Sequence, residues 1–299
     1  VLLIPGGFRE ATGDSTEEEA IAKTAQTAGM RVMGPNCLGV IHHGSQTRDL
    51  INTFFITQDK FKSVTSGRVP VAILSQSGAL SLVQISNLHH TIRPQLVASY
   101  GNALDVGPAE LLRYVSEHET IRAVGVYIEG FRNGEGQEFV QAARESPVPV
   151  VVYKAGRTAV GRAATESHTA SLAGEYAVAR SAFHQYGIIE ADTIEDHTDL
   201  LRTFALLHGK TRGGRNLAVV TNAGYEKANA ADSVGELKPA NLSKRTNEKL
   251  EAILPPFVGV DPLLDITPMS NDSVYEQALS VLLEDPNVDA AVFSVVPHS

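Results

Sequence analysis

The chain has 299 residues, of which 43% are hydrophobic and 20% charged, and its formal net charge is −9. This composition is typical of a globular protein and leaves room for about two domains. The negative charge argues against general nucleic-acid binding, which needs a basic face. No apolar run approaches the ~18 residues of a membrane span, so we expect no membrane association. The single cysteine, Cys37, excludes an internal disulfide and favours a reducing, cytoplasmic location.

Short apolar runs alternate with amphipathic segments along the chain, which predicts an α/β fold with doubly wound parallel sheets. Segments with apolar residues at three- and four-residue steps predict the helices. The chain opens on the apolar run VLLIPGGFRE without an initiator Met and stops just after a predicted strand, so we expect a piece of a larger polypeptide. The predicted strands are 1–4, 31–33, 69–74, 96–99, 123–128, 148–153, 188–190, 217–221 and 290–296.

Two polar segments, 57–68 and 208–216, interrupt this alternation. We predict a partial domain over residues 1–62, a complete α/β domain over residues 63–185 and a second α/β unit over residues 186–299. In that last unit Thr193 and Asp196 predict the capped start of a helix that runs through Leu207.

Polar residues follow two of the predicted strands, at the sheet edge where ligands bind in open α/β sheets. After strand 69–74 the chain continues into a helix, whose first turn suits a phosphate group. In that turn Ser77 could cap the helix and Gly78 could allow close backbone approach, although an ordinary capped turn explains the same pattern. After strand 96–99 comes a loop with Gly101 and Asn102. The candidate phosphate-binding residues are Ser75, Gln76, Ser77, Gly78 and Ala79.

A third strand end carries Glu129, and a later segment of small residues, ESHTASLAG, carries His168. A single loop histidine is usually structural or solvated. A histidine can accept a phosphoryl group when one ring nitrogen is free and the other donates to a carboxylate. The small residues would let the backbone of this loop change its path. We therefore predict that His168 is a phosphoryl acceptor and Glu129 its partner.

Four motifs occur along the chain: GPNCLGV (34–40), SQSGAL (75–80), YIEG (127–130) and SHTASLAG (167–174). In this order and spacing they resemble those of the alpha part of NDP-forming acyl-CoA synthetases. These enzymes are relatives of succinyl-CoA synthetase, and the motifs look most like their ADP-forming acetyl-CoA synthetase branch. The resemblance covers nearly the whole chain. It implies a partial Rossmann-like CoA-binding domain followed by tandem flavodoxin-like domains, the first of which carries the phosphohistidine loop.

The resemblance also implies roles for individual residues. His168 matches the phosphorylated histidine, Glu129 matches the acid that hydrogen-bonds it, and residues 75–79 match the phosphate-holding loop. CoA and the acyl group would contact Gly34, Pro35, Asn36, Cys37, Gly101 and Asn102.

The resemblance further implies an acid–thiol ligase, of which this chain would be an incomplete piece. It would interconvert acyl-CoA, ADP and phosphate with acid, CoA and ATP. Its partners would be a small acyl substrate and an ATP-grasp (beta) domain or subunit that binds ATP or ADP with Mg²⁺, in an oligomer. We expect no metal ligands in this chain, because the pairs His42–His43 and His89–His90 lack metal-ligand spacing.

Two positions depart from the family pattern. Ala170 stands where glycine is usual, and the glycine-rich turn of the last domain reads Asn222-Ala-Gly-Tyr-Glu-Lys227, which weakens the case for an anion site there. Asp265 matches a family pattern loosely. An alternative function is a non-catalytic acyl-CoA-sensing module of a protein acyltransferase. The sensor would bind CoA without being phosphorylated.

Overall fold

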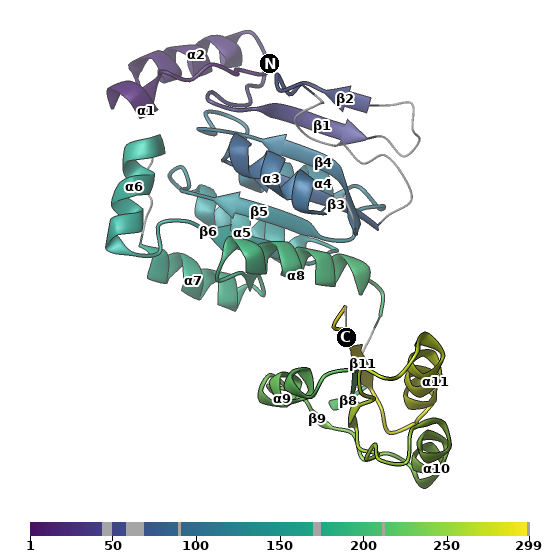
Figure 1. Ribbon diagram of the computed structural model, residues 1–299. Coiled ribbons are helices and arrows are strands. Elements are labelled where there is room, and N and C mark those ends of the chain that lie inside the picture. The colour runs from purple at the N-terminus through teal and green to yellow at the C-terminus, as the bar shows by residue number, and fades with distance from the viewer. Residues whose placement is uncertain (44–49, 58–68, 89–90, 170–174, 211–212, 298–299) are drawn as a thin grey trace. The chain divides into compact units, whose positions relative to one another are not determined.

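The computed structural model describes residues 1–43, 50–57, 69–88, 91–169, 175–210 and 213–297, and of residues 50 and 166–169 the backbone alone. It divides into two compact units, residues 1–208 and 209–299 (Figure 1). No helix in these described ranges is long and apolar enough to cross a bilayer.

The first unit is built on a seven-stranded sheet with the order β2-β1-β4-β3-β5-β6-β7. The strands from β4 to β7 in this order are parallel to one another, whereas β1 is antiparallel to both β2 and β4. The strands are β1 (Gly39–His43), β2 (Leu50–Asn52), β3 (Val69–Ser75), β4 (Ile92–Ser99), β5 (Val124–Ile128), β6 (Val150–Lys154) and β7 (Ile189–Glu190).

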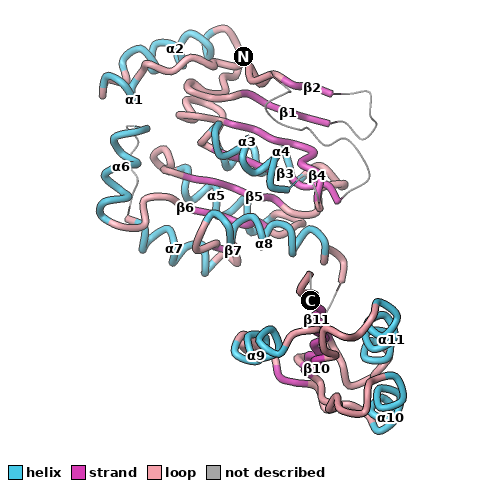
Figure 2. The backbone as a smooth tube through the Cα atoms, in the orientation of Figure 1, coloured by secondary structure: helices cyan, strands magenta, loops and turns pink. Residues whose placement is uncertain are grey.

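Helices cover both faces of this sheet (Figure 2). Helices α4, α5 and α7 contribute to the apolar cluster on one face, and α3 and α8 to the cluster on the other. The helices of this unit are α1 (Arg9–Thr12), α2 (Thr16–Thr27), α3 (Gly78–Leu88), α4 (Pro108–Ser116), α5 (Glu135–Glu145), α6 (Ala159–Thr169), α7 (Tyr176–Gln185) and α8 (Ile194–Leu206).

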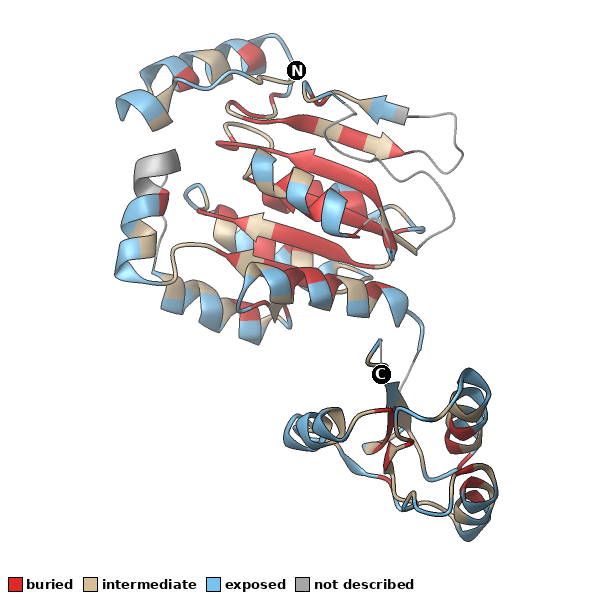
Figure 3. Cartoon of the chain, viewed as in Figure 1, coloured by how far each residue is buried: buried red, intermediate tan, exposed pale blue. Residues whose placement is uncertain are grey.

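The central strands are apolar at nearly every position because both of their faces are buried (Figure 3). In β3, Val71 and Ile73 pack into the cluster with α3 and α8, while Ala72 and Leu74 pack into the cluster with α4, α5 and α7. This alternation follows from the two-residue period of a strand. The continuous apolar runs of the sequence therefore predicted the middle of this sheet correctly.

The second unit has a smaller parallel sheet in which β8 pairs with β9, β10 and β11. Its described apolar core joins β8 and β10 to α10 and α11. The elements are β8 (Asn216–Thr221), α9 (Gly224–Asp232), β9 (Lys238–Pro239), α10 (Lys244–Ile253), β10 (Leu263–Asp265), α11 (Asp272–Leu283) and β11 (Ala290–Phe293).

The structure corrects the predicted boundary at 185/186. Strand β7 pairs with β6, and Leu201 and Ala205 of α8 are buried in the core of the first unit. The second unit therefore begins at Gly209. The predicted break at 62/63 is also crossed by strand pairing, because β1 joins β4 of the same sheet.

The predicted strand 1–4 forms only an isolated bridge between Leu2 and Met33. Leu3 N donates to Met33 O and Met33 N donates to Val1 O, at 2.9 and 3.0 Å. Pro5 then follows and has no N–H to extend the pairing.

Candidate functional site

The loop after β3 is a tightly bonded turn at the carboxyl edge of the first sheet. Ser75 is fully buried and its Oγ donates to the carbonyl oxygen of Ser77 at 2.8 Å. The Oγ of Ser77 accepts from Leu80 N at 3.3 Å, so the predicted cap of α3 is confirmed. The free N–H groups of the first turn of α3 give this end a positive potential.

Gly78 allows this helix start to pack closely against a segment that is distant in sequence. A Cβ atom at Gly78 would lie 3.0 Å from Cβ of Leu38. Leu38 N donates to Ser99 Oγ at 3.1 Å, which fixes the segment against the end of β4. The start of α3 at Gly78 therefore does approach another segment closely, as the glycine suggested.

A cleft of about 570 Å³ opens between these two segments. Four of the five candidate phosphate-binding residues line it, together with Asn36 and Cys37 of the candidate CoA segment. The structure thus brings together two motifs that are about forty residues apart in the sequence. The lining residues are Ile4, Pro5, Gly6, Asn36, Cys37, Leu38, Phe55, Ile56, Gln76, Ser77, Gly78, Ala79 and Leu82.

Gly34, Pro35, Gly101 and Asn102 lie beside this cleft but do not line it. Asn102 N donates to Pro35 O at 2.9 Å, which joins the two candidate segments directly. The side chain of Asn102 is buried, and its Nδ2 donates to Glu10 Oε2 at 2.7 Å and to Glu18 Oε1 at 3.0 Å. The Asn102 amide nitrogen therefore orients two carboxylates of the N-terminal segment.

Cys37 borders the cleft, although its side chain is buried. Its Sγ lies 3.5 Å from the carbonyl oxygen of Leu3. Burial raises the pKa of this thiol to about 11, so the nucleophilic thiolate is scarce near neutral pH. Cys37 can therefore shape the wall of the cleft, but it is poorly suited to covalent catalysis.

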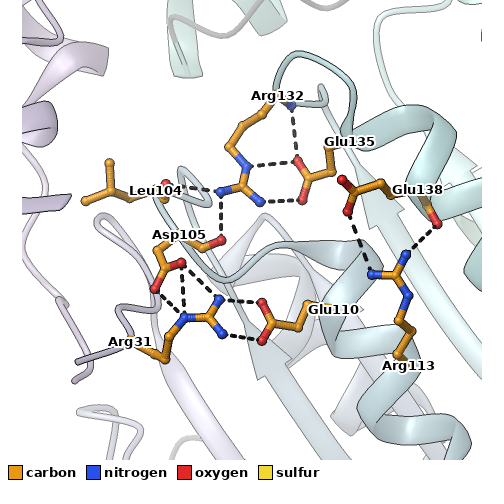
Figure 4. Close-up of polar contacts among 8 residues, drawn as sticks. All are labelled: Arg31, Leu104, Asp105, Glu110, Arg113, Arg132, Glu135 and Glu138. Carbon is orange, nitrogen blue, oxygen red and sulfur yellow. Dashed lines mark hydrogen bonds and ion pairs between the residues drawn. The ribbon is translucent and has the colours of Figure 1, made fainter. Parts of the chain in front are cut away.

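Two arginines hold the loop that follows Gly101 and Asn102 (Figure 4). Arg31 pairs with Asp105 at 2.9 Å and with Glu110 at 2.6 Å. The same Arg31 contact is the main reason why the pKa of Asp105 is lowered. Arg132 donates to the carbonyl oxygens of Leu104 and Asp105, at 3.1 and 2.7 Å. This loop is therefore fixed from two sides of the first unit.

Glu129 follows β5 directly and is buried, 7% exposed. Its backbone N–H donates to Gln76 Oε1, as does that of Gly130 at 3.0 Å. Lys154 Nζ donates to the carbonyl oxygen of Glu129 at 2.7 Å. The pKa of Tyr127 is raised, first by burial and then by Glu129, whose carboxylate accepts a hydrogen bond from the Tyr127 hydroxyl. Lys154 was not among the predicted site residues, because its contact with Glu129 depends on the order of the strands in the sheet.

His168 lies in the last turn of α6, and its side chain is outside the described part of the structure. The predicted contact between His168 and Glu129 therefore stays a prediction. The expected loop is a helix up to Thr169, because the small residues include alanines such as Ala163 and Ala164, which favour helix. Helix α6 lies beside α1 (Figure 1).

Arg157 anchors the segment that leads from β6 into α6. Its guanidinium donates to the carbonyl oxygens of Lys154 at 3.1 Å, of Asp192 at 2.9 Å and of Ala191. It also lies over the ring of Tyr153, with 4.8 Å between Cζ and the ring centroid. The start of this segment is thus tied to β6 and to the end of β7.

In the second unit, the turn after β8 is occupied by its own side chains. Thr221 Oγ1 donates to Glu226 Oε2 at 2.6 Å, so a carboxylate lies near the start of α9. Asn222 exchanges two hydrogen bonds with Val296. Asp265 ends β10, and its Oδ1 accepts from Thr267 N at 2.9 Å. These contacts agree with the expectation that an anion site is weakened at this turn.

Residues 68–204 match the family model described as "Succinyl-CoA ligase like flavodoxin domain". The chain is 34% identical to the alpha subunit of "Acetate--CoA ligase [ADP-forming] II" of Pyrococcus furiosus, over 99% of this chain and 63% of that protein. The chain is thus similar over nearly its whole length to ADP-forming acyl-CoA ligases. The chain is also similar to the "4-hydroxybutyrate--CoA ligase [ADP-forming]" of Nitrosopumilus maritimus, 27% identical over 99% of this chain and 42% of that protein.

Two solved structures have the same fold as this chain. The chain matches the acetyl-coenzyme A synthetase 1 of Ca. Korarchaeum cryptofilum, solved with phosphate and ADP, at a TM-score of 0.86 and 30% identity. The match covers 98% of this chain and 62% of that chain. PH0766 from Pyrococcus horikoshii matches at a TM-score of 0.80 and 30% identity, over 100% of this chain and 62% of that one. The chain thus spans less than two thirds of the length of these relatives.

Proposed function

We propose that the chain is the alpha part of an NDP-forming acyl-CoA synthetase, which interconverts acyl-CoA, ADP and phosphate with acid, CoA and ATP. The observation that carries this proposal is the cleft that joins residues 76–79 at the start of α3 to Asn36 and Cys37. An anionic group held at the helix start would lie beside the segment to which the resemblance assigns contacts with CoA and the acyl group. The wall of the cleft is apolar at Leu38, Ile56 and Leu82, which suits an acyl chain.

In the proposed reaction, phosphate attacks the thioester carbonyl, the C–S bond breaks, and CoA leaves with an acyl phosphate formed. A ring nitrogen of His168 then forms a bond to phosphorus as the bond between phosphorus and the acyl oxygen breaks, which releases the acid. The phosphoryl group finally passes from His168 to ADP on an ATP-grasp partner with Mg²⁺. In this scheme Glu129 accepts a hydrogen bond from the other ring nitrogen and supports the developing positive charge.

Phosphohistidine formation tests this proposal directly. The full-length protein with its ATP-grasp partner is incubated with Mg²⁺ and ATP labelled at the γ-phosphate, and acid-labile protein-bound label is measured. We expect the parent protein to be labelled and His168→Ala to lose the label, because no acceptor nitrogen remains. His208→Ala is the matched control and should be labelled like the parent. Label that persists in His168→Ala would refute the assignment.

The alternative function, acyl-CoA sensing without catalysis, draws its support from the carboxylate of Glu226 at the start of α9. The same preparation distinguishes the two functions. A sensor would bind acyl-CoA in a titration while the parent protein acquires no label. A synthetase would bind acyl-CoA and become labelled.

A further inference from the structure

The turn that carries Glu129 is held from both neighbouring strands of the sheet. Strand β5 lies between β3 and β6 in the sheet order. From the β3 side, Gln76 Oε1 accepts the N–H groups of Glu129 and of Gly130, the latter at 3.0 Å. From the β6 side, Lys154 Nζ donates to the carbonyl oxygens of Glu129 and Ala155, both at 2.7 Å. We call Gln76 and Lys154 the Glu129 clamp.

The Glu129 clamp binds both polar groups of a single peptide unit. The carbonyl group of Glu129 and the N–H group of Gly130 belong to one planar peptide unit. Lys154 binds its oxygen and Gln76 binds its hydrogen, so a flip of this unit would break both bonds. Gln76 also binds the N–H group of Glu129 itself, which fixes the backbone on both sides of its Cα atom.

The chemistry of Gln76 fixes its orientation. Both partners of its side chain are N–H donors, so the amide oxygen must face them and the amide nitrogen must face away. Gln76 lines the cleft, 7% exposed. Its side chain therefore connects the loop that begins α3 with the turn that carries Glu129.

Burying Lys154 at this position is unfavourable, because its cation loses its contact with water. Its side chain is 1% exposed, and burial lowers its pKa to about 8, against an opposing contribution from Glu129. An apolar side chain could fill the same volume without burying a cation. An apolar residue could not supply the hydrogen bond that Lys154 donates to the Glu129 turn.

We propose that Gln76 and Lys154 are positioning residues, which fix the direction in which the Glu129 carboxylate meets the reacting histidine. This inference rests on the proposed function of Glu129 as the partner of His168. It assigns Gln76 a role beyond phosphate binding: its oxygen acts through Glu129 and not on the phosphoryl group. Neither residue has to touch the reacting atoms to affect the rate.

The test is a double-mutant cycle on the rate of phosphohistidine formation, measured by rapid quench in the full-length protein with its ATP-grasp partner. Gln76→Ala and Lys154→Met are each made in the parent and in the Glu129→Gln background. In the parent we expect each to slow labelling on the order of ten- to a hundredfold, because a displaced catalytic group loses its geometry. In the Glu129→Gln background each should cost less than about twofold, because the group they position is already lost. The KM for ATP should not change.

Gln95→Ala is the matched control. Gln95 is also buried in this sheet, and its Oε1 also accepts two hydrogen bonds, from Arg93 and Thr120. Its loss should lower stability without slowing labelling. Lys154→Arg keeps a cation and its donors, and should recover part of the rate that Lys154→Met loses.

The outcomes separate this inference from the proposed function. A parent protein that acquires no label would overturn both. A parent that is labelled, with Gln76→Ala equally harmful in both backgrounds, would overturn the inference alone, because Gln76 would then act independently of Glu129. Should Lys154→Met fail to fold, the Gln76 cycle and Lys154→Arg decide the matter: the inference fails if that cycle is additive.

Discussion

At the scale of single residues, His197 shows how a buried histidine can be structural. It lies in α8 and is completely buried. Its Nε2 is 3.2 Å from the carbonyl oxygen of Val151, which can only accept, so Nε2 must carry the proton. Its Nδ1 then accepts from Gln84 Nε2 at 2.7 Å. One ring nitrogen thus joins α8 to β6 and the other joins α8 to α3, and neither is left for catalysis.

This arrangement predicts a pH-dependent stability. Burial lowers the pKa of His197 to about 4, below the ordinary 6.5, so between these values the unfolded chain binds the extra proton. Stability should therefore fall as pH decreases, by about 2 kcal/mol between pH 7 and pH 5 from this group. His197→Gln removes the titrating group, so urea unfolding monitored by circular dichroism should show a weaker pH dependence. Parallel curves for the two proteins would contradict the expectation.

At the scale of elements, the turn after β4 depends on one glycine. Gly101 has a φ of +55°, and a Cβ atom there would lie 2.1 Å from Pro35 O and 2.4 Å from Asn36 O. The turn and the segment of the cleft wall that contains Asn36 therefore touch through their backbones. No side chain fits between them.

Gly101→Ala should consequently destabilise the first unit by about 2 kcal/mol or more, because the backbones must separate as well as adopt an unfavourable φ. Gly13→Ala is the matched control: its φ is +73°, but a Cβ atom there meets open space. We expect that change to cost only about 1 kcal/mol. The midpoint of urea unfolding measures both. Equal losses would show that the contact with Pro35 contributes nothing.

Sequence patterns predicted some of these elements better than others. The family resemblance implied phosphate binding for residues 76–79 and CoA binding for Asn36, and the structure places both at one cleft. Strand β1 was missed because His42 and His43 interrupt its apolar pattern. Lys154 was missed as a site residue because its role depends on the strand order, in which β5 lies between β3 and β6. No local pattern contains that order.

At the scale of the whole molecule, the first unit needs the chain as far as α8. A Cβ atom at Gly125 would lie 2.8 Å from Leu201 Cδ2, so this helix packs directly on the middle of β5. Ending the chain at 185 would remove β7 and α8 and expose one face of the central strands. The boundary between the compact units instead falls within the polar segment 208–216 identified from the sequence.

Truncation tests this boundary. We expect residues 1–208 to fold with a cooperative unfolding transition, since they keep both apolar clusters of the sheet. Residues 1–185 should aggregate or be digested at least tenfold faster by a protease, because an apolar face is left uncovered. Size-exclusion chromatography and limited proteolysis compare the two. Equal protease resistance would place the boundary at 185 after all.

Arg157 anchors the segment of the chain that follows it. Its bonds to Lys154, Ala191 and Asp192 pin the chain as it leaves β6. Any displacement of position 168 must therefore pivot downstream of Arg157, and the maximum reach of that histidine is set by the ten residues between them. Fully extended, this segment spans at most about 40 Å from Arg157. The distance over which this chain could carry a group is thus limited by the anchoring of one arginine.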